Sequence, residues 1–335
     1  MNIKLKDIAQ VTGVSITTVS LVLNNKPIRV SEEKRQEILK TAKNMNYTVN
    51  IAARTLVTKK SHVLGLIVPD IENVFFSKLT KHLEEICLEN NYILLILISN
   101  DRLASDLLLL DILISRQVDG IFLCPSNEAF NSSDLTKKLD EIATPVILVD
   151  RVFSDSHLNK VYFDNESGAY GAVSYLIENG HKKIAIIAPP AESKMRNSRL
   201  SGYLKALEDN NIPQDDTIIY YGDYKFKSGY QIAQEILKTD ATAVFSCNDM
   251  MTLGFLKAIQ EKKKQIPKDI SIVSYDNILD DFTFGLEITS VIQDTGLLAQ
   301  ESFKAYQKFI KSKKVKDRIL KTKMIERGSV LRITQ

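Results

Sequence analysis

Two successive series of short apolar runs constrain the fold of this 335-residue chain more than any other feature. The runs are rich in Val, Ile and Leu, as is typical of strands that are buried on both faces of a parallel sheet. Helical stretches separate them, so both series predict doubly wound α/β sheets. The predicted strands are 63–68, 92–98, 120–123, 146–149 and 161–163 in the first series, and 184–188, 217–221, 243–247 and 270–274 in the second.

Two such series predict two similar lobes within one α/β body. In parallel sheets of this kind, ligands bind outside the carboxyl ends of the strands. We therefore expect a cleft between the lobes, lined by residues that follow the predicted strands.

Several classes of protein are disfavoured by composition. No apolar run approaches the roughly 20 residues that a membrane-spanning helix needs, and polar Asp7 and Gln10 stand where a signal peptide needs its apolar stretch. The three cysteines and four histidines are scattered, which predicts no disulfide framework, no metal site and no cofactor. We expect a cytoplasmic protein without a membrane partner.

Charge is divided unevenly along the chain. Residues 1–60 contain 11 Lys/Arg and four Asp/Glu, a net charge of +7, whereas the remaining 275 residues contain 33 and 37, a net charge of −4. A small basic head on an acidic body favours contact between the head and a polyanion. A solvated lysine-rich helical surface is the alternative, and the later basic run at 304–323 fits that second description.

The basic head contains the pattern of three short helices. Gly13 breaks the first helix, which has Ile8 and Val11 as an apolar pair, and Ser15 is a good N-cap for the second. Ser31 caps a third, whose apolar stripe is Ile38, Ala42 and Met45. Two short helices joined by a glycine turn match a helix-turn-helix.

In that geometry the second helix enters the major groove of DNA with its N-terminus first. Ile16 and Thr17 then point at base edges, while Ser15 and Thr18 donate to phosphates. A three-helix bundle without a ligand is the alternative, and the charge and position of the head favour DNA.

Two motifs in this region resemble the lactose/galactose repressor (LacI/GalR) family of transcriptional regulators. Residues 6–24, Lys-Asp-Ile-Ala-Gln-Val-Thr-Gly-Val-Ser-Ile-Thr-Thr-Val-Ser-Leu-Val-Leu-Asn, resemble its DNA-binding headpiece, and residues 46–56 resemble its hinge helix. The resemblance implies that the hinge folds on the operator and that Leu56 enters the minor groove as an apolar wedge. Val49 and Val57 differ from the residues usual in the family. Leu21 replaces a common arginine or histidine, and an apolar side chain there favours a thymine methyl.

The set of DNA-binding residues implied by the resemblance spans the headpiece and the hinge. It consists of Ser15, Ile16, Thr17, Thr18, Leu21, Asn24, Arg29, Tyr47, Asn50, Ala53, Arg54 and Leu56.

The resemblance continues through short motifs in family order to Arg327-Gly-Ser329, and it implies a body of the periplasmic-binding-protein type. It divides the chain into a headpiece at 1–46, a hinge helix and linker at 47–60, and an effector-binding and dimerisation domain at 61–335. The N-lobe covers about 61–161 and 293–322, and the C-lobe about 162–292 and 323–335. The chain ends without leucine heptads, so we expect a homodimer and no tetramer.

Three candidate effector-binding residues, Asp164, Asn248 and Asp276, follow predicted strands. Arg199 lies early in a predicted helix and offers a planar fork of donors, and carboxylate or amide acceptors opposite such a fork suit a polyol. Strand-end caps are the alternative for Asn248 and Asp276, and a structural ion pair is the alternative for Arg199. Phe76 is favoured over Phe75 for stacking on a sugar, while Asp150 and Arg151 are left out because they could pair either with each other or with the ligand. With Gln293 added by resemblance, the predicted set is Phe76, Asp164, Arg199, Tyr224, Asn248, Asp276 and Gln293.

The function that follows is a regulator, in most cases a repressor, of a carbohydrate-utilisation operon. Its DNA affinity is switched by a small-molecule effector, and local likeness is greatest to ribose-type regulators. A purine-responsive or phosphoprotein-responsive regulator is the alternative within the family. No nucleotide-binding loop, nucleophile elbow or His-Glu-x-x-His motif occurs, which disfavours an enzyme; a solute-binding protein is disfavoured by the headpiece.

Overall fold

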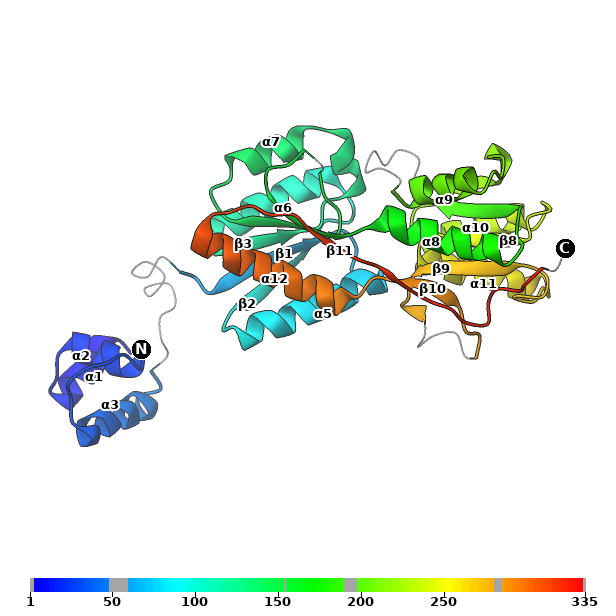
Figure 1. Cartoon of the computed structure of the whole chain (residues 1–335). Coiled ribbons are helices and arrows are strands. Elements are labelled where there is room, and N and C mark those ends of the chain that lie inside the picture. Colours follow the sequence, from blue (N-terminus) through cyan, green and yellow to red (C-terminus); the bar gives the residue numbers. More distant parts are fainter. Residues whose placement is uncertain (1–2, 48–59, 154, 190–197, 280–284, 334–335) are drawn as a thin grey trace. The chain divides into compact units, whose positions relative to one another are not determined.

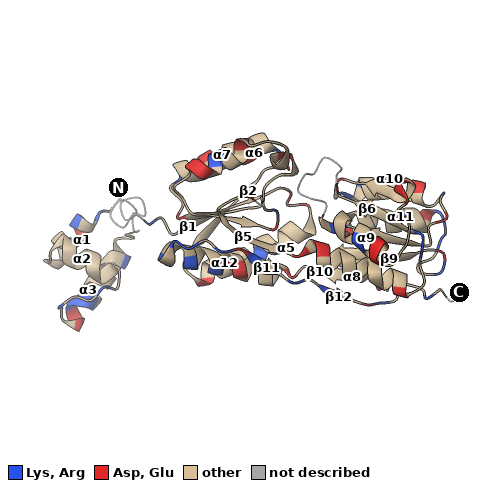
Figure 2. Cartoon of the chain, turned by 45° about the horizontal axis from the view of Figure 1, so that its top comes forward, with Lys and Arg blue, Asp and Glu red and all other residues tan. Residues whose placement is uncertain are grey.

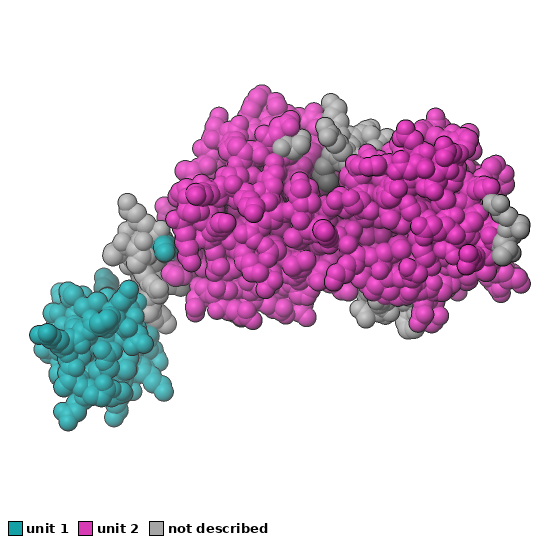
Figure 3. Space-filling view, viewed as in Figure 1, with its two compact units in different colours: residues 1–61 teal, residues 62–335 magenta. Residues whose placement is uncertain are grey.

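The computed structural model describes residues 3–47, 60–153, 155–189, 198–279 and 285–333. The chain divides into two compact units, Met1–Ser61 and His62–Gln335, which Figure 3 distinguishes by colour. We call the first unit the headpiece and the second the body.

The headpiece consists of the three expected helices, α1 (Leu5–Thr12), α2 (Ile16–Leu23) and α3 (Glu32–Asn44). Gly13 ends α1 in the left-handed backbone region at φ 66°, a conformation that costs glycine least. The Ser15 and Ser31 side chains accept hydrogen bonds from the backbone N–H of Thr18 and Lys34, so both predicted N-caps are present.

The small core of the headpiece confirms most of the predicted apolar stripe. Ile8, Ile38 and Ala42 are buried, and Met45 packs partly buried against them. Val11, the other member of the apolar pair that indicated this helix, has a side chain that is 64% exposed. The buried residues of α1 are Ile8, Ala9 and Thr12, so the inward face is centred on the side of Ala9 and Val11 lies at its exposed margin.

The body consists of two α/β lobes (Figure 1). The N-lobe sheet is parallel and has the order β11-β5-β4-β3-β1-β2. Its strands are β1 (Val63–Val68), β2 (Ile93–Ile98), β3 (Gly120–Leu123), β4 (Val146–Val149), β5 (Asn159–Phe163) and β11 (Arg318–Leu320). Its helices are α5 (Val74–Glu89), α6 (Leu103–Ser115), the 3-10 helix η1 (Asn127–Asn131), α7 (Asp134–Glu141) and α12 (Thr295–Ser312).

The C-lobe sheet has the order β12-β10-β9-β8-β6-β7, with only β12 antiparallel to its neighbour. Its strands are β6 (Ile184–Ala188), β7 (Ile219–Tyr221), β8 (Ala243–Ser246), β9 (Ser271–Asp276), β10 (Thr289–Ile292) and β12 (Lys323–Ile325). Its helices are α8 (Asn165–Glu178), α9 (Ser198–Asp209), α10 (Phe226–Ile236), α11 (Asp249–Glu261) and the 3-10 helix η2 (Asp216–Ile218).

The predicted strands are therefore all present, with small differences at their ends. The strand predicted at 217–221 begins as the 3-10 helix η2 and is extended only over Ile219–Tyr221. The strand predicted to end at 274 continues to Asp276, because Tyr275 and Asp276 pair with the late strand β10, which sequence periodicity did not reveal.

The chain passes between the lobes at three described places: from β5 to α8, from β10 to α12, and from β11 to β12. Two separate apolar clusters cover the two faces of the N-lobe sheet, and a third fills the C-lobe. The inner strands carry almost no charge, as Figure 2 shows, whereas Lys, Arg, Asp and Glu lie on the helices and loops around them. Both lobes thus hold a rigid sheet whose carboxyl ends can carry a site.

Helices α10 and α11 approach each other so closely that glycine is required at the contact. A Cβ atom on Gly229 would overlap the backbone carbonyl of Met251, and one on Gly254 would overlap the carbonyl of Phe226. In contrast, a Cβ on Gly171 of α8 would meet nothing within 4 Å.

We expect Gly229→Ala to destabilise the protein by about 1–3 kcal/mol, because backbone atoms cannot move aside as a flexible side chain can. The matched variant Gly171→Ala should stabilise it by about 0.4–1 kcal/mol through reduced freedom of the unfolded chain. Urea unfolding of both variants measures the two values. Equal stability of the two variants would contradict the tight helix contact.

Candidate functional site

The helix-turn-helix of the headpiece presents a short polar surface at the start of α2. The Ser15 Oγ accepts from the Thr18 N–H at 3.0 Å and shares a hydrogen bond with the Thr18 hydroxyl at 2.9 Å. Ile16 is 49% exposed and Thr17 is also exposed. An apolar side chain held in solvent at the N-terminus of a recognition helix is available to a base edge.

The other predicted DNA-binding residues of the headpiece are placed around this surface. Leu21 is half-buried on α2, Arg29 is exposed in the following loop, and Tyr47 packs partly buried against the headpiece core. Asn24 is exposed, and its side-chain N–H donates to the Ser20 carbonyl at 2.7 Å. The hinge residues Asn50, Ala53, Arg54 and Leu56 lie outside the described residues.

A cavity lies between the lobes of the body. Its volume is about 50 Å³, room for a few molecules the size of water at roughly 10–15 Å³ each. Six of the seven predicted effector residues line it, and only Asp164 does not. The lining consists of Asn73, Phe75, Phe76, Asp150, Arg151, Asn165, Pro189, Ser198, Arg199, Tyr224, Asn248, Asp276 and Gln293.

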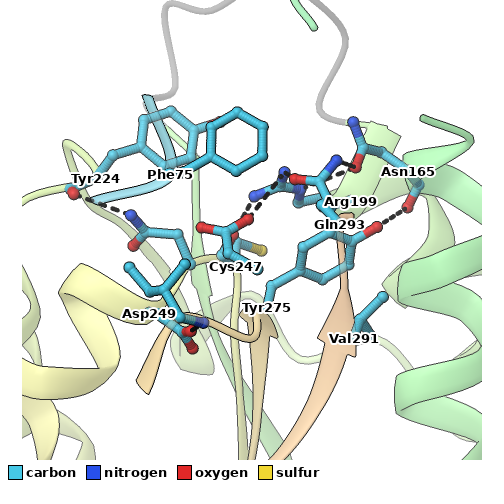
Figure 4. Close-up of polar contacts among 12 residues, drawn as sticks. Phe75, Asn165, Arg199, Tyr224, Cys247, Asp249, Tyr275, Val291 and Gln293 are labelled. Carbon is cyan, nitrogen blue, oxygen red and sulfur yellow. Dashed lines mark hydrogen bonds and ion pairs between the residues drawn. The ribbon is translucent and has the colours of Figure 1, made fainter. Parts of the chain in front are cut away.

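Arg199 is the centre of the polar contacts in this cavity (Figure 4). Its Nε donates to the Asn165 Oδ1 at 3.3 Å, and one terminal nitrogen donates to the Gln293 Oε1 at 2.7 Å. The other terminal nitrogen donates to the backbone carbonyl of Cys247. The guanidinium carbon lies 4.0 Å from the centre of the Tyr275 ring, so both the edge and the face of the group are engaged.

Asp276 stands beside this arginine at the end of β9. The Arg199 Nη2 lies 3.6 Å from the Asp276 Oδ1, and both side chains are buried. Burial raises the pKa of the Asp276 carboxyl to about 6, against the lowering effect of Arg199. Arg199 thus combines the predicted structural ion pair with a place in the cavity wall.

Asn248 likewise caps a helix, as one of the two predictions for it had it, and also lines the cavity. Its Oδ1 accepts from the Met251 N–H at 3.0 Å and so caps α11, while its Nδ2 donates to the Tyr224 carbonyl at 3.0 Å. The cap fixes the amide in the cavity wall beside Tyr224, whose pKa is raised to about 12 by burial.

The N-lobe side of the cavity holds a second arginine, Arg151. Its Nη1 lies 2.6 Å from the Asp101 Oδ1, and Asp101 also accepts from the backbone and the side chain of Asn127 at 2.8 Å each. The Arg151 guanidinium lies 5.4 Å from the centre of the Phe76 ring and 5.9 Å from that of Tyr224. Because Tyr224 belongs to the C-lobe, this cation–π contact joins the two lobes.

The aromatic residues Phe75 and Phe76 lie on α5 and are both buried. Their ring centres are 5.2 Å apart and the rings are nearly perpendicular, at 79°. Both line the cavity, so a choice of one of them as the cavity residue was unnecessary.

Asp164 lies just outside the cavity and caps α8. Its carboxylate accepts from the Ser167 N–H at 3.1 Å and from the Ser167 hydroxyl at 2.7 Å. The next residue, Asn165, faces the cavity and accepts from Arg199 and Gln293. The helix cap uses the Asp164 side chain, and the helix that it starts presents Asn165 instead.

Three cavity residues have backbones in the left-handed region that non-glycine residues seldom adopt. They are Asp150 at φ 64°, Tyr224 at φ 64° and Asp276 at φ 96°. Such conformations persist only where surrounding contacts enforce them, and they concentrate at functional sites. Their presence together supports a ligand-binding role for the cavity.

Asp150 and Arg151 could have been found from sequence, because they follow β4 as Asn248 follows β8. Residues that follow parallel strands are expected at the cavity, but these two were left out because they could equally have paired with each other. Asn73, Phe75, Asn165, Pro189 and Ser198 also line the cavity and were not singled out. Among the described residues, no group of three or more His, Cys, Asp or Glu side chains could hold a metal ion.

The fold and the site together define a helix-turn-helix regulator with a two-lobed ligand-sensing body. Residues 4–50 match the family of bacterial regulatory proteins of the lacI type, and residues 61–334 match the periplasmic binding proteins and sugar binding domain of the LacI family. The chain belongs to the LacI family of DNA-binding transcriptional regulators, which is a family of regulators and not of enzymes.

Several relatives are similar over most of the chain. The transcriptional repressor PurR of Histophilus somni is 32% identical, over 92% of this chain and 92% of its own. The structure of the lac repressor dimer bound to operator and the anti-inducer ONPF has a TM-score of 0.88, with 25% identity over 99% of this chain and 100% of that one. A LacI family regulator from Enterococcus faecium with bound ribose has a TM-score of 0.72 and 29% identity, over 81% of this chain and all of that one. None of the helices in the described ranges is long and apolar enough to span a membrane.

Asp249, at the start of α11 next to the cavity wall, gives a test of the raised carboxyl pKa values in this region. It is fully buried, accepts hydrogen bonds from the Ser274 hydroxyl and the Ile278 N–H, and has its pKa raised to about 8 by burial and by Asp276. The folded protein therefore retains protons on Asp249 and Asp276 that the unfolded chain releases near pH 4. Since the folded state binds more protons, the free energy of unfolding should fall as pH rises through both raised pKa values.

We expect Asp249→Asn, which keeps the shape of the carboxyl group, to flatten this fall between about pH 6.5 and 8. Urea unfolding across that range measures the slope. Asp209→Asn, at an exposed position near the end of α9, is the control and should keep the wild-type slope. A wild-type slope in Asp249→Asn would show that Asp249 is ionised in the folded protein.

Proposed function

We propose that the protein is a homodimeric repressor of a carbohydrate-utilisation operon and that a sugar in the interlobe cavity switches its affinity for operator DNA. The observation that carries this proposal is the cavity wall itself. Guanidinium donors, carboxylate acceptors and amides that do both surround the space, with aromatic rings beside them.

Such a wall matches the chemistry of a monosaccharide. Every sugar hydroxyl both donates and accepts, so it needs partners of both kinds at several points around the ring. Arg199 and Arg151 supply donors, while Asp150 and Asp276 supply acceptors. Phe76 and Tyr224 offer apolar surface to the C–H face of a ring, as small-molecule sites combine apolar walls with a few placed polar groups.

The placement of the polar groups favours a sugar over a purine. The space of about 50 Å³ holds only a few molecules the size of water, so either ligand requires some separation of the lobes. A purine presents two flat apolar faces and polar groups only at its edge, whereas the polar groups here come from both lobes. The bound ribose in the E. faecium regulator supports a pentose as the first ligand to test, and the relative PurR makes a purine the competitor.

Recognition of DNA is assigned to the exposed start of α2, with Ile16 and Thr17 at base edges and Ser15 and Thr18 at phosphates. The hinge at 47–60, with Leu56 as the minor-groove wedge, completes the proposed DNA contacts. Two headpieces in a homodimer would read the two halves of a pseudo-palindrome, since a two-fold protein selects a two-fold site.

The homodimer is supported by an exposed apolar strand at the edge of the N-lobe sheet. On β2, Ile93, Ile96 and Ile98 are 63%, 38% and 39% exposed, and Leu88 at the end of α5 is exposed as well. An uncovered apolar edge strand is a pairing surface that monomeric proteins avoid. We assign this surface to a second copy of the chain.

The switch itself follows from the cavity's position between lobes. A sugar can change operator affinity only by binding one arrangement of the lobes more tightly than the other. The N-lobe carries the headpiece, so a change in its position relative to the C-lobe would alter the spacing of two headpieces in a dimer.

Operator binding in the presence of sugars tests the effector proposal. We expect the full-length protein to bind a duplex carrying the palindrome upstream of its own gene, and a pentose from a panel of sugars and purines to weaken that binding. Arg199→Lys keeps a positive charge beside Asp276 but loses the planar fork, so it should bind the operator normally and need about 10- to 100-fold more sugar for release. Fluorescence anisotropy of the labelled duplex measures both quantities.

Arg116→Lys, at an exposed position after α6, is the matched control and should respond as the wild type does. Release by a purine alone would replace the sugar with a purine effector. Binding that strengthens with ligand would make the protein a co-repressor-dependent regulator. An unchanged sugar response in Arg199→Lys would remove Arg199 from the ligand contacts.

Sedimentation equilibrium tests the homodimer. Ile96→Lys combined with Ile98→Lys should shift the protein from dimer to monomer at micromolar concentration, because two charges at an apolar contact oppose their burial. Val11→Lys, which adds a charge at an exposed apolar position of the headpiece, should leave the dimer intact. A monomeric wild type would refute the homodimer, and a dimeric double variant would place its interface elsewhere.

A further inference from the structure

The end of α12 and the loop after it form a strongly basic segment that neither the cavity nor the headpiece uses. Residues 308–316 contain five lysines, at positions 308, 311, 313, 314 and 316, and no acidic residue. All five are exposed. Since residues 61–335 have a net charge of −4, removing this +5 leaves −9 for the rest of them. We call residues 308–316 the lysine segment.

The acidic residues next to the lysine segment are engaged elsewhere. Glu301 pairs with Lys304 at 2.9 Å and with Arg318, and Asp317 pairs with Lys160 at 3.2 Å. Over the described ranges, the five lysines of the segment have no ion-pair partner within 4.0 Å. Their charge is therefore not neutralised within the described parts of the chain.

The lysine segment lies at the amino ends of the N-lobe strands. The Tyr306 hydroxyl, two residues before it, donates to the Asp119 carbonyl ahead of β3 at 3.4 Å. The Lys316 N–H donates to the Asn159 Oδ1 at the start of β5 at 3.0 Å. His62, where the chain enters the body, also donates its N–H to Asp119, at 3.0 Å. The segment and the chain's entry thus share one end of the lobe, and Figure 2 shows Lys and Arg gathered there around the end of α12.

We propose that the lysine segment binds phosphates of duplex DNA flanking the operator sequence that the headpiece reads. This inference rests on the proposed binding of operator DNA. It adds a second contact, made by the body, which carries affinity but no sequence information.

Duplex DNA is the polyanion that the observations favour. The covalent path from the DNA-binding headpiece enters the body at this end, so a DNA bound by the headpiece meets the segment at high effective concentration. Exposed lysines act as flexible point charges, so they can bind the phosphates of duplex DNA whatever its base sequence. Single-stranded nucleic acid would call for exposed aromatic rings, and the ring of Phe309 within the segment is half-buried and carries the Lys313 ammonium 5.2 Å from its centre.

The test compares two full-length variants in which the same amount of positive charge is removed. The first carries Lys311→Gln, Lys314→Gln and Lys316→Gln. The control carries Lys262→Gln, Lys263→Gln and Lys268→Gln, which are exposed positions around the end of α11 in the C-lobe. All six changes are at exposed positions, so both variants should keep the wild-type melting temperature.

Operator affinity is measured against salt on two duplexes, one of about 20 base pairs carrying the palindrome alone and one of about 60 with flanking DNA on both sides. On the long duplex, the first variant should bind about 10-fold more weakly at low salt. The slope of log affinity against log salt should become shallower by about 1 for each phosphate that the variant no longer binds. On the short duplex, both variants should bind as the wild type does.

An unchanged slope of the first variant on the long duplex, with the wild type bound to both duplexes, would overturn the proposed role of the lysine segment and leave operator recognition intact. An equal weakening in the control variant would also overturn it, because the effect would then be one of net charge. A wild type that bound neither duplex would refute operator binding itself, and this inference with it.

Discussion

The hydrogen bonds of a single buried guanidinium connect the C-lobe with two of the passages of the chain between the lobes. Arg199 extends from α9 in the C-lobe and contacts Asn165 and Gln293. Asn165 begins α8 directly after the first passage between the lobes, and Gln293 lies in the second passage. A buried charge is stable only where its donors are satisfied. Arg199 thus gives the C-lobe direct side-chain contacts with two of the passages.

These contacts of Arg199 connect the wall of the cavity with the passages between the lobes. A ligand oxygen that accepts from Arg199 competes with Asn165 and Gln293 or adds to them, and in either case changes the balance of interactions at the passages. On the opposite wall, Arg151 reaches Tyr224 across the cleft, held by Asp101 on its own lobe. Residues that line the cavity thus also join the two lobes in this structure, so a ligand that changes their contacts can favour one arrangement of the lobes over another.

The sequence predicted which strand ends carry cavity residues better than it predicted which side chains pair with one another. Apolar strands and their carboxyl ends placed Asn248 and Asp276 beside the cavity, because the pattern of a parallel sheet is local and periodic. The pairing of Arg151 with Asp101 joins residues 50 positions apart, and no local pattern encodes it. Asp164 was predicted at the cavity, but its neighbour Asn165 lines it. The Asp164 carboxylate caps α8, and only the three-dimensional structure shows which of the two adjacent residues faces the cavity.

The parallel topology also separates the two ends of the N-lobe by function. The cavity lies at the carboxyl ends of the strands, while the chain from the headpiece and the lysine segment lie at their amino ends. A strand of six residues such as β1 spans about 20 Å, and apolar clusters pack both faces of the sheet between these ends. Interiors packed in this way do not deform continuously. Under the proposed function, a ligand at one end would act on DNA at the other by moving the N-lobe as a rigid body, and a second copy paired along the exposed edge strand β2 would turn that movement into a change in headpiece spacing.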